Sequence, residues 1–352
     1  MLRQSFDGAQ DDSVTMEFAP LLRRVLGGED LSADEAAAFV GEIMDASFTP
    51  VQAAALLTAL AFKGESVDEI VGAARAMRER SLHVEHGLPM VVDVVGTGGD
   101  HANTINISTM AALVVAAAGV PVAKHGNRAA SSACGSADVL ESAGFPIEVS
   151  PDLAARMLRE CGFTFMFAPH YHPAMRNAAG IRRELGVRTI FNLLGPLTNP
   201  ARATHQIVGV AREELVERVG PALRKLGARR GAVVHGCSGL DEVAGDAPTL
   251  IYSFDEEGAR LWRLEPSEFG IAGDLRTPVG GSVGICRDAF VEILHGGRSA
   301  AADVVALNAA VVFYVVGVES ELPAAFERAR ALLRSGAAWQ IFECAKRIGS
   351  YG

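Results

Sequence analysis

Two short apolar runs, each ending in a glycine-rich polar turn and each leading to a helical pattern, constrain the fold of this chain most. They lie within residues 90–144. A strand, a turn and a helix repeated at this spacing are typical of a mostly parallel sheet covered by helices. Because the carboxyl ends of parallel strands meet at one edge of a sheet, we expect the two turns to lie together there.

The residues of these turns suit oxyanions. Glycines in Gly96–Asp100 permit positive φ angles, so several backbone N–H groups can converge on an anion. Asn106–Thr109 opens the next helix, where free amides and the helix dipole favour a phosphate. Lys124–Arg128 adds two cations, and a serine-rich segment ending at Ser136 leads to another helix. Each segment alone is often only a turn or an N-cap, but their order predicts a site for a ligand with more than one phosphate. The dinucleotide and Walker signatures are absent from the sequence.

Two later segments carry further candidates. Asp241 and Glu242 follow a predicted strand at 231–235 and could bind Mg²⁺, although an exposed acidic turn is an equally good interpretation of the residues alone. The segment 167–200 contains four arginines, any one of which could pair with a substrate carboxylate. They are Arg176, Arg182, Arg183 and Arg188, and the sequence alone does not distinguish them. For His170 and His172 we expect packing roles or roles in supporting other site residues, because no third soft metal ligand stands near them.

The N-terminal region has a different pattern. Capping boxes begin at Ser32, Thr49 and Ser66, and they predict three or more short helices before Leu82 with no strand between them. The length of 352 residues also favours two domains. We therefore expect a small helical domain over residues 1–88 and an α/β domain over residues 89–352. Within the second, we expect a hairpin over 249–264 and helices at about 300–317, 323–334 and 337–347.

Composition excludes several classes of function. The formal net charge of −10 disfavours a general nucleic-acid or anionic-membrane binder. The N-terminus has no apolar signal core, and the most apolar stretches are too short to span a membrane. The five cysteines are widely spaced and odd in number, so we expect free thiols and a reducing, cytoplasmic location.

The chain resembles anthranilate phosphoribosyltransferases. The matching motifs are GTGGD at 96–100, NIST at 106–109, KHGNR at 124–128, GSADVLE at 135–141, FAPHYHPAMR at 167–176, RRELGVRTIFNLLGPLTNPA at 182–201 and HGxxGLDE at 235–242. The resemblance implies a small helical domain, completed by about residues 181–203, beside a larger α/β domain of the nucleoside phosphorylase type. It also implies a homodimer formed through the helical domain. The implied reaction is transfer of the 5-phosphoribosyl group from phosphoribosyl pyrophosphate to anthranilate, in tryptophan biosynthesis, with Mg²⁺.

The resemblance also implies site residues. Phosphoribosyl pyrophosphate would be held by Gly96, Gly99, Asp100, Thr104, Asn106, Ile107, Ser108, Thr109, Lys124, His125, Gly126, Asn127, Arg128, Ala129, Ala130, Ser131, Ser132 and Ser136. Two Mg²⁺ ions per subunit would be bound by Ser108, Asp241 and Glu242, and anthranilate by Gly96, Asn127 and Arg182. Lys124 would stabilise departing charge, and no side chain is expected to act as an obligatory acid or base, His125 included.

The sequence departs from the family pattern in a few places, and alternatives stay open. His101, Gly180 and Cys237-Ser238 replace residues usual in the family, which affects loop geometry more than the type of reaction. One alternative is a nucleoside phosphorylase of the same fold, which lacks the KHGNR and RRELGVRTIFNLLGPLTNP motifs. Another is a fold relative that uses a different amine or merely binds nucleic acid, and the acidic charge disfavours a nucleic-acid binder.

Overall fold

The N-terminal part of the chain is a bundle of helices. The computed structural model describes residues 17–100, 102–129, 132–271 and 279–351. The bundle contains α1 (Phe18–Leu26), α2 (Ala33–Met44), α3 (Pro50–Lys63) and α4 (Val67–Glu79). The three predicted capping boxes are confirmed: in the first, Glu35 N–H donates to Ser32 Oγ at 3.2 Å while Ser32 N–H donates to Glu35 Oε2 at 2.9 Å. These caps satisfy amides that the first turn of each helix leaves free, and so fix where α2, α3 and α4 begin.

A seven-stranded sheet forms the centre of the rest of the molecule, in the order β3-β2-β1-β4-β5-β6-β7. The strands are β1 (Val92–Gly96), β2 (Val122–Gly126), β3 (Phe163–Phe167), β4 (His205–Gly209), β5 (Arg230–Gly236), β6 (Thr249–Phe254) and β7 (Ala259–Leu264). Pairing is parallel from β3 through β5, and β6 and β7 add an antiparallel hairpin. The predicted mostly parallel sheet and its hairpin are confirmed.

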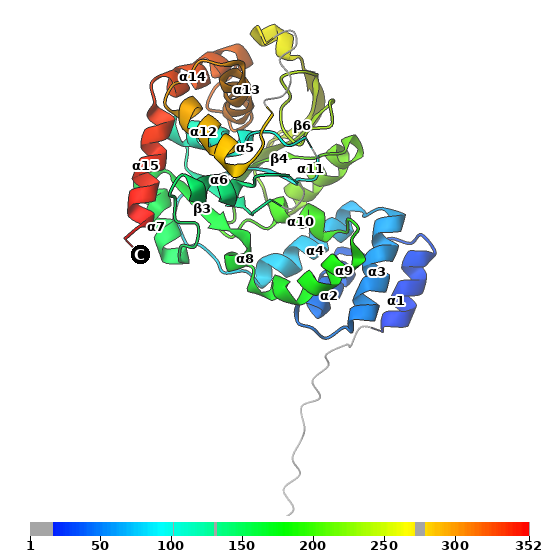
Figure 1. Ribbon diagram of the computed structural model, residues 1–352. Coiled ribbons are helices and arrows are strands. Elements are labelled where there is room, and N and C mark those ends of the chain that lie inside the picture. Colours follow the sequence, from blue (N-terminus) through cyan, green and yellow to red (C-terminus); the bar gives the residue numbers. More distant parts are fainter. Residues whose placement is uncertain (1–16, 101, 130–131, 272–278, 352) are drawn as a thin grey trace, which may run out of the picture.

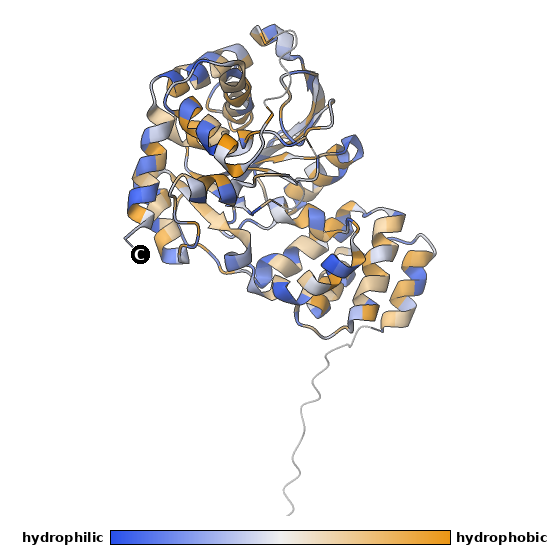
Figure 2. Ribbon diagram, viewed as in Figure 1, coloured by the Kyte–Doolittle hydropathy of each residue, from blue (hydrophilic) through white to orange (hydrophobic). Residues whose placement is uncertain are grey.

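Helices bury both faces of the sheet, as expected when neighbouring strand residues are all apolar. Ile207 and Val208 are adjacent on β4 but belong to different apolar cores. The core that contains Ile207 is covered by α5 (Ile107–Ala117), α13 (Ala300–Val315), α14 (Leu322–Arg334) and α15 (Ala337–Gly349). The core that contains Val208 is covered by α4, α10 (Phe191–Leu197) and α11 (Val216–Lys225). The remaining α-helices are α6 (Ser136–Ser142), α7 (Pro151–Cys161), α8 (Ala168–Tyr171), α9 (Arg176–Leu185) and α12 (Val283–Leu294). Outer helices such as α15 alternate hydrophilic and hydrophobic residues along their length (Figure 2).

The segment containing α9 and α10 returns to the N-terminal helices (Figure 1). Helix α9 packs against α2 and α3, and Asn177 Nδ2 donates to the Met44 carbonyl at 2.6 Å. Ala178 and Leu194 are fully buried in the same core as Leu56. These contacts join a middle segment of the chain to the helical bundle, while the domain limits given above stay a prediction.

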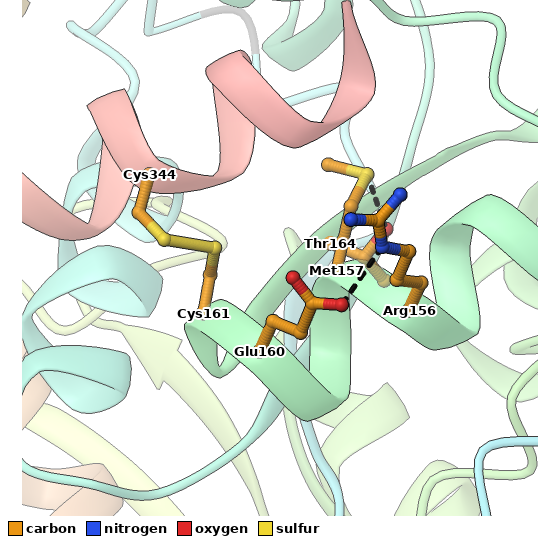
Figure 3. Close-up of a disulfide and its surroundings, with 6 residues drawn as sticks. All are labelled: Arg156, Met157, Glu160, Cys161, Thr164 and Cys344. Carbon is orange, nitrogen blue, oxygen red and sulfur yellow. Dashed lines mark hydrogen bonds and ion pairs between the residues drawn. A yellow bond between two sulfur atoms is a disulfide. The ribbon is translucent and has the colours of Figure 1, made fainter. Parts of the chain in front are cut away.

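One pair of cysteines corrects the expectation of free thiols. Cys161 on α7 and Cys344 on α15 form a disulfide across a Cα–Cα distance of 5.9 Å (Figure 3). The pair is 183 residues apart in sequence, and only the packing of α15 against α7 brings the two thiols together. Cys134, Cys237 and Cys286 are free, as expected. Within the described residues, no helix has the length and apolar content needed to cross a membrane.

Candidate functional site

The ends of two central strands open a space for an acidic loop. β1 ends at Gly96 and β4 at Gly209, and these two glycines are paired in register. A Cβ atom on Gly96 would overlap the Asp241 carboxylate, and one on Gly209 would overlap the Asp241 backbone carbonyl. Glycine is therefore required at both positions for Asp241 to lie across the carboxyl ends of the strands. This close approach places Asp241 beside the first glycine-rich turn.

The first turn is held open in a conformation that suits an anion. Gly98 and Gly99 have φ angles of 71° and 79°, in the left-handed region that glycine adopts without strain. Gly98 N–H donates to Asp241 Oδ2 at 2.6 Å, and Thr97 N–H donates to the Gly209 carbonyl at 2.9 Å. Consecutive residues in such conformations turn neighbouring amides into one concavity, which is a common anion site.

Helix α5 brings its N-terminus to the same edge. Ser108 N–H donates to Glu242 Oε1 at 3.2 Å, so Glu242 occupies part of the positive end of the helix. Lys124, in the middle of β2, is 1% exposed. Its Nζ donates to Ser108 Oγ at 3.2 Å and to the Val94 carbonyl at 2.5 Å. The lysine thus ties β1, β2 and α5 together beside the two carboxylates.

The electrostatics of this cluster favour an added cation. Burial raises the pKa of Glu242 to about 7, against the opposing effect of Lys124. Burial and the neighbouring Glu242 raise the pKa of Asp241 well above its ordinary value. Burial also lowers the pKa of Lys124. The two acids thus lie in a site where their negative charge is poorly compensated.

The donor set fits Mg²⁺ better than a transition metal. Asp241, Glu242 and the Ser108 hydroxyl offer hard oxygen atoms, and no set of three or more His, Cys, Asp or Glu side chains gathers anywhere in the described part of the chain. Mg²⁺ usually keeps several waters and is held by one or two carboxylates together with substrate phosphates. The residues present therefore fit a Mg²⁺ ion that arrives with a phosphorylated ligand.

The second turn folds on itself beside the N-terminus of α5. Gly126 and Gly135 permit this, because a Cβ on the former would overlap Ser136 Oγ and one on the latter would overlap the Ala129 amide. Ser136 Oγ donates to the Asn127 carbonyl at 3.2 Å, and Asn106 Nδ2 donates to the Cys134 carbonyl at 3.2 Å. The second turn and the start of α5 are thus joined, and together they form a rim at this edge of the sheet. Asn106 is the N-cap residue of α5, but its side chain makes no capping hydrogen bond.

Several other predicted residues have clear positions. Thr104 pairs with Val279 in an isolated bridge. Ile107 and Thr109 are buried in the core. Asp100 is half-buried and accepts from Ala102 N–H at 3.2 Å. Ala129 and Ser132 continue the second turn, whereas Ala130 and Ser131 lie outside the described residues.

The predicted arginines differ in how their charge is used. Arg128 pairs with Asp138 at 3.0 Å and Glu141 at 2.8 Å on α6, so its charge is already compensated. Arg182 on α9 lies over the Phe191 ring at 5.6 Å, and no ion pair reaches it from the described residues. Burial lowers the pKa of Arg182. Because no acid is paired with it, its guanidinium is available to the carboxylate of a ligand.

Sequence reasoning missed a buried polar network below the rim. Asp93 Oδ1 accepts from His125 N–H at 3.2 Å, and Asp93 Oδ2 accepts from Asn199 Nδ2 at 2.7 Å. Burial raises the pKa of Asp93 to about 6. His125 Nδ1 lies 2.9 Å from the Gly195 carbonyl, its ring is 5.0 Å from that of His172, and burial lowers its pKa to about 4. The sequence offered one signal for this network, which was an acid alone within an apolar strand. A charge buried in such a strand requires polar partners.

The comparisons with known proteins agree with this architecture. The model of the glycosyl transferase family a/b domain matches residues 88–339, and that of its helical bundle domain matches residues 19–81. The anthranilate phosphoribosyltransferase of Herpetosiphon aurantiacus is 48% identical over 92% of this chain and 97% of its own length. That of Moorella thermoacetica is 48% identical over 90% of this chain and 94% of its own length.

Solved structures give the same result. The anthranilate phosphoribosyltransferase from Thermus thermophilus superposes with a TM-score of 0.88 at 42% identity, covering 94% of this chain and 99% of that one. The Saccharomyces cerevisiae enzyme in complex with PRPP and Mg has a TM-score of 0.86 at 26% identity, covering 95% and 98%. With relatives this similar over nearly its whole length, the chain belongs to the anthranilate phosphoribosyltransferase family.

Proposed function

We propose that this protein transfers the 5-phosphoribosyl group from phosphoribosyl pyrophosphate to the amine of anthranilate. The products are N-(5-phosphoribosyl)anthranilate and pyrophosphate, the second step of tryptophan biosynthesis from chorismate. The observation that carries the proposal is the meeting of Asp241, the glycine turn and the N-terminus of α5 at one sheet edge. The family relationship established above supports the same reaction.

In the reaction, the amine nitrogen forms a bond to the anomeric carbon as the bond to pyrophosphate breaks, and the substituted amine then releases one proton. The main task is to stabilise negative charge on the leaving group, because the ring itself develops positive character. We propose that the amides of the Gly96–Asp100 turn and the ammonium of Lys124 do this, which is supported by the positive φ angles of the turn and by the contact of Lys124 with Ser108 at the start of α5. These groups are held by the fold before substrate arrives, so little reorganisation is needed.

Asp241, Glu242 and Ser108 would hold Mg²⁺ at this site. A bound Mg²⁺ neutralises charge on the diphosphate. We propose two ions per subunit, because two adjacent carboxylates with raised pKa values can each serve one.

The acceptor side needs positioning more than proton transfer. The aryl amine of anthranilate is neutral near pH 7, so no strong base is required. His125 is neutral at that pH, with its pKa lowered by burial to about 4, and it is a weak base. We propose that Arg182 and Asn127, with Gly96 nearby, orient the anthranilate carboxylate and ring, which places the amine for attack.

The fall of anthranilate fluorescence on addition of phosphoribosyl pyrophosphate and Mg²⁺ tests the proposal. We expect the fall to require both additions and to be matched by an equal amount of pyrophosphate. Pyrophosphate release with another amine but not with anthranilate would support a same-fold transferase with a different acceptor. Phosphate-dependent cleavage of a pyrimidine nucleoside would support the phosphorylase alternative.

We also propose a homodimer formed through the helical bundle. Val51 and Phe62 on α3 are 79% and 93% exposed, and they share a helix face because they are about three turns apart. Such a patch is typical of an interface. Sedimentation should show a dimer that Phe62→Glu dissociates, while Ile285→Glu, which changes an exposed apolar residue on α12, should leave it intact. A monomeric parent protein would refute this.

A cytoplasmic location stays a proposal, and a disulfide there would be an exception to the usual reduced state.

A further inference from the structure

Arg188 lies in the connection between α9 and α10 and reaches the first glycine turn. Its Nη1 and Nη2 each lie 3.3 Å from the Gly98 carbonyl oxygen, and Nη1 lies 3.4 Å from that of Gly99. A Cβ atom on Gly99 would overlap the guanidinium. The close approach of this arginine therefore depends on glycine at position 99, in addition to the positive φ angle there.

These contacts decide which way the following amides point. In a trans peptide the carbonyl and the N–H of the same plane point in opposite directions, and no cis peptide occurs in the described residues. Holding the Gly98 and Gly99 carbonyls toward Arg188 therefore turns the N–H groups of Gly99 and Asp100 away from it. Neither N–H donates a hydrogen bond to any acceptor in the described part of the chain. Two adjacent amides are thus free to bind an anion.

The guanidinium is not committed to an acid. Among the described residues no carboxylate lies within ion-pair distance of Arg188, although its neighbour Arg212 pairs with Glu214 at 3.4 Å. An arginine has five donors in a rigid fork, which suits it to bridge two successive carbonyls. A charged group that hydrogen-bonds to backbone in place of an acid fixes the conformation of that backbone.

We propose that Arg188 is a positioning residue for the leaving group. It holds the Gly98–Gly99 carbonyls so that the amides of Gly99 and Asp100 face the diphosphate of the substrate. The proposal rests on the function proposed above. It also makes the α9–α10 connection part of the substrate site, since the residue that orients the turn comes from a segment packed on the helical bundle.

Steady-state kinetics of Arg188→Ala test the proposal. We expect the KM for phosphoribosyl pyrophosphate to rise about tenfold, the size expected when a charge-assisted hydrogen bond is lost. The KM for anthranilate should change less than about threefold, because Arg188 does not contact that substrate, whereas kcat should fall as well, because the same amides stabilise the charge on the departing diphosphate. Arg188→Lys should recover part of the loss, because an ammonium can still donate to one of the two carbonyls. Millimolar guanidinium should restore part of the affinity of Arg188→Ala only.

Two matched variants separate positioning from charge. Arg183→Ala removes an exposed arginine from the end of α9 and should behave as the parent protein. Arg212→Ala removes a positive charge that influences Arg188 without touching the glycine turn. If Arg212→Ala raised the same KM equally, Arg188 would act by charge alone and the proposal would fall. It would also fall if Arg188→Ala raised only the KM for anthranilate, which would indicate direct contact with that substrate.

Calorimetric titration with phosphoribosyl pyrophosphate and Mg²⁺ keeps this inference separate from the proposed function. If the parent protein does not consume anthranilate, the proposed function fails, yet the binding constants of the parent and Arg188→Ala can still be compared. Equal binding constants would refute the role of Arg188 whatever the acceptor is.

Discussion

The imidazole of His172 is expected to make the protein less stable as the pH falls below about 6.5. His172 is 2% exposed, and burial, with a smaller effect of His125, lowers its pKa to about 3. In the unfolded chain the pKa returns to its ordinary value of 6.5. Between these two values the unfolded chain binds a proton that the folded protein does not, so stability is lost as pH falls through this window.

The size of the effect follows from the two pKa values. From pH 7.5 to pH 5 the loss amounts to about 2 kcal/mol, with a slope that approaches about 1.4 kcal/mol per pH unit. Buried acids such as Asp93, whose pKa is raised to about 6, act in the opposite direction, so the total pH dependence does not isolate this residue. Comparison with a variant that lacks the imidazole removes those contributions, because both proteins retain them.

Guanidinium unfolding of the parent protein, His172→Gln and His172→Leu at pH 7.5 and pH 5 provides the assay. The two variants will differ in stability, because they pack differently, but neither titrates. We expect the parent to lose about 2 kcal/mol more than either variant on going to pH 5. A stability gap that is the same at both pH values for both variants would refute the reasoning.

Three further changes have definite expected results. Gly209→Ala should lower the free energy of unfolding by about 1–3 kcal/mol and remove most of the activity, because its Cβ would overlap the Asp241 backbone. Gly180→Ala should not be destabilised, because a Cβ atom at Gly180 meets no atom within contact distance. Equal losses in the two variants would contradict the overlap argument. Cys344→Ser should lower the melting temperature, since a bridge across 183 residues contributes up to about 5 kcal/mol in the chain-entropy account. Reductant should lower the melting temperature of the parent by the same amount and leave the variant unchanged, and a parent insensitive to reductant would count against the disulfide. The affinity for Mg²⁺, measured by titration, should rise from pH 6 to pH 8, because burial raises the pKa of Glu242 to about 7 and the metal binds the ionised form; a flat or falling affinity would count against Glu242 as a ligand.

Local patterns in the sequence were sufficient for much of the fold. The hydroxyl–acid spacing at Ser32 and Ser66 depends on residues within one turn, and so it located helix starts correctly. The apolar runs before the glycine turns likewise located the starts of β1 and β2, because strands that are buried on both faces are rich in apolar residues. Helix α10 was not foreseen, since Gly195 and Pro196 near its end argue against a helix; the proline stands in the last turn.

Contacts between distant segments could not be derived from local pattern. Nothing in the sequence links Cys161 to Cys344, or Asp93 to Asn199, before the helices and strands are packed. Arg188 was one of four arginines that could pair with a substrate carboxylate, and the sequence alone did not distinguish them. Only its three-dimensional position beside the glycine turn distinguishes Arg188 from the others. For the site, residue type and spacing indicated a phosphate-binding edge, whereas the network that orients it depends on tertiary contacts.

Anomalous diffraction from crystals grown with phosphoribosyl pyrophosphate and Mn²⁺ in place of Mg²⁺ tests the account most directly. We expect metal peaks at coordination distance from Asp241 and Glu242, with the diphosphate lying over the amides that follow Gly98. Metal and diphosphate bound together at another place on the protein, with this sheet edge left empty, would contradict the account.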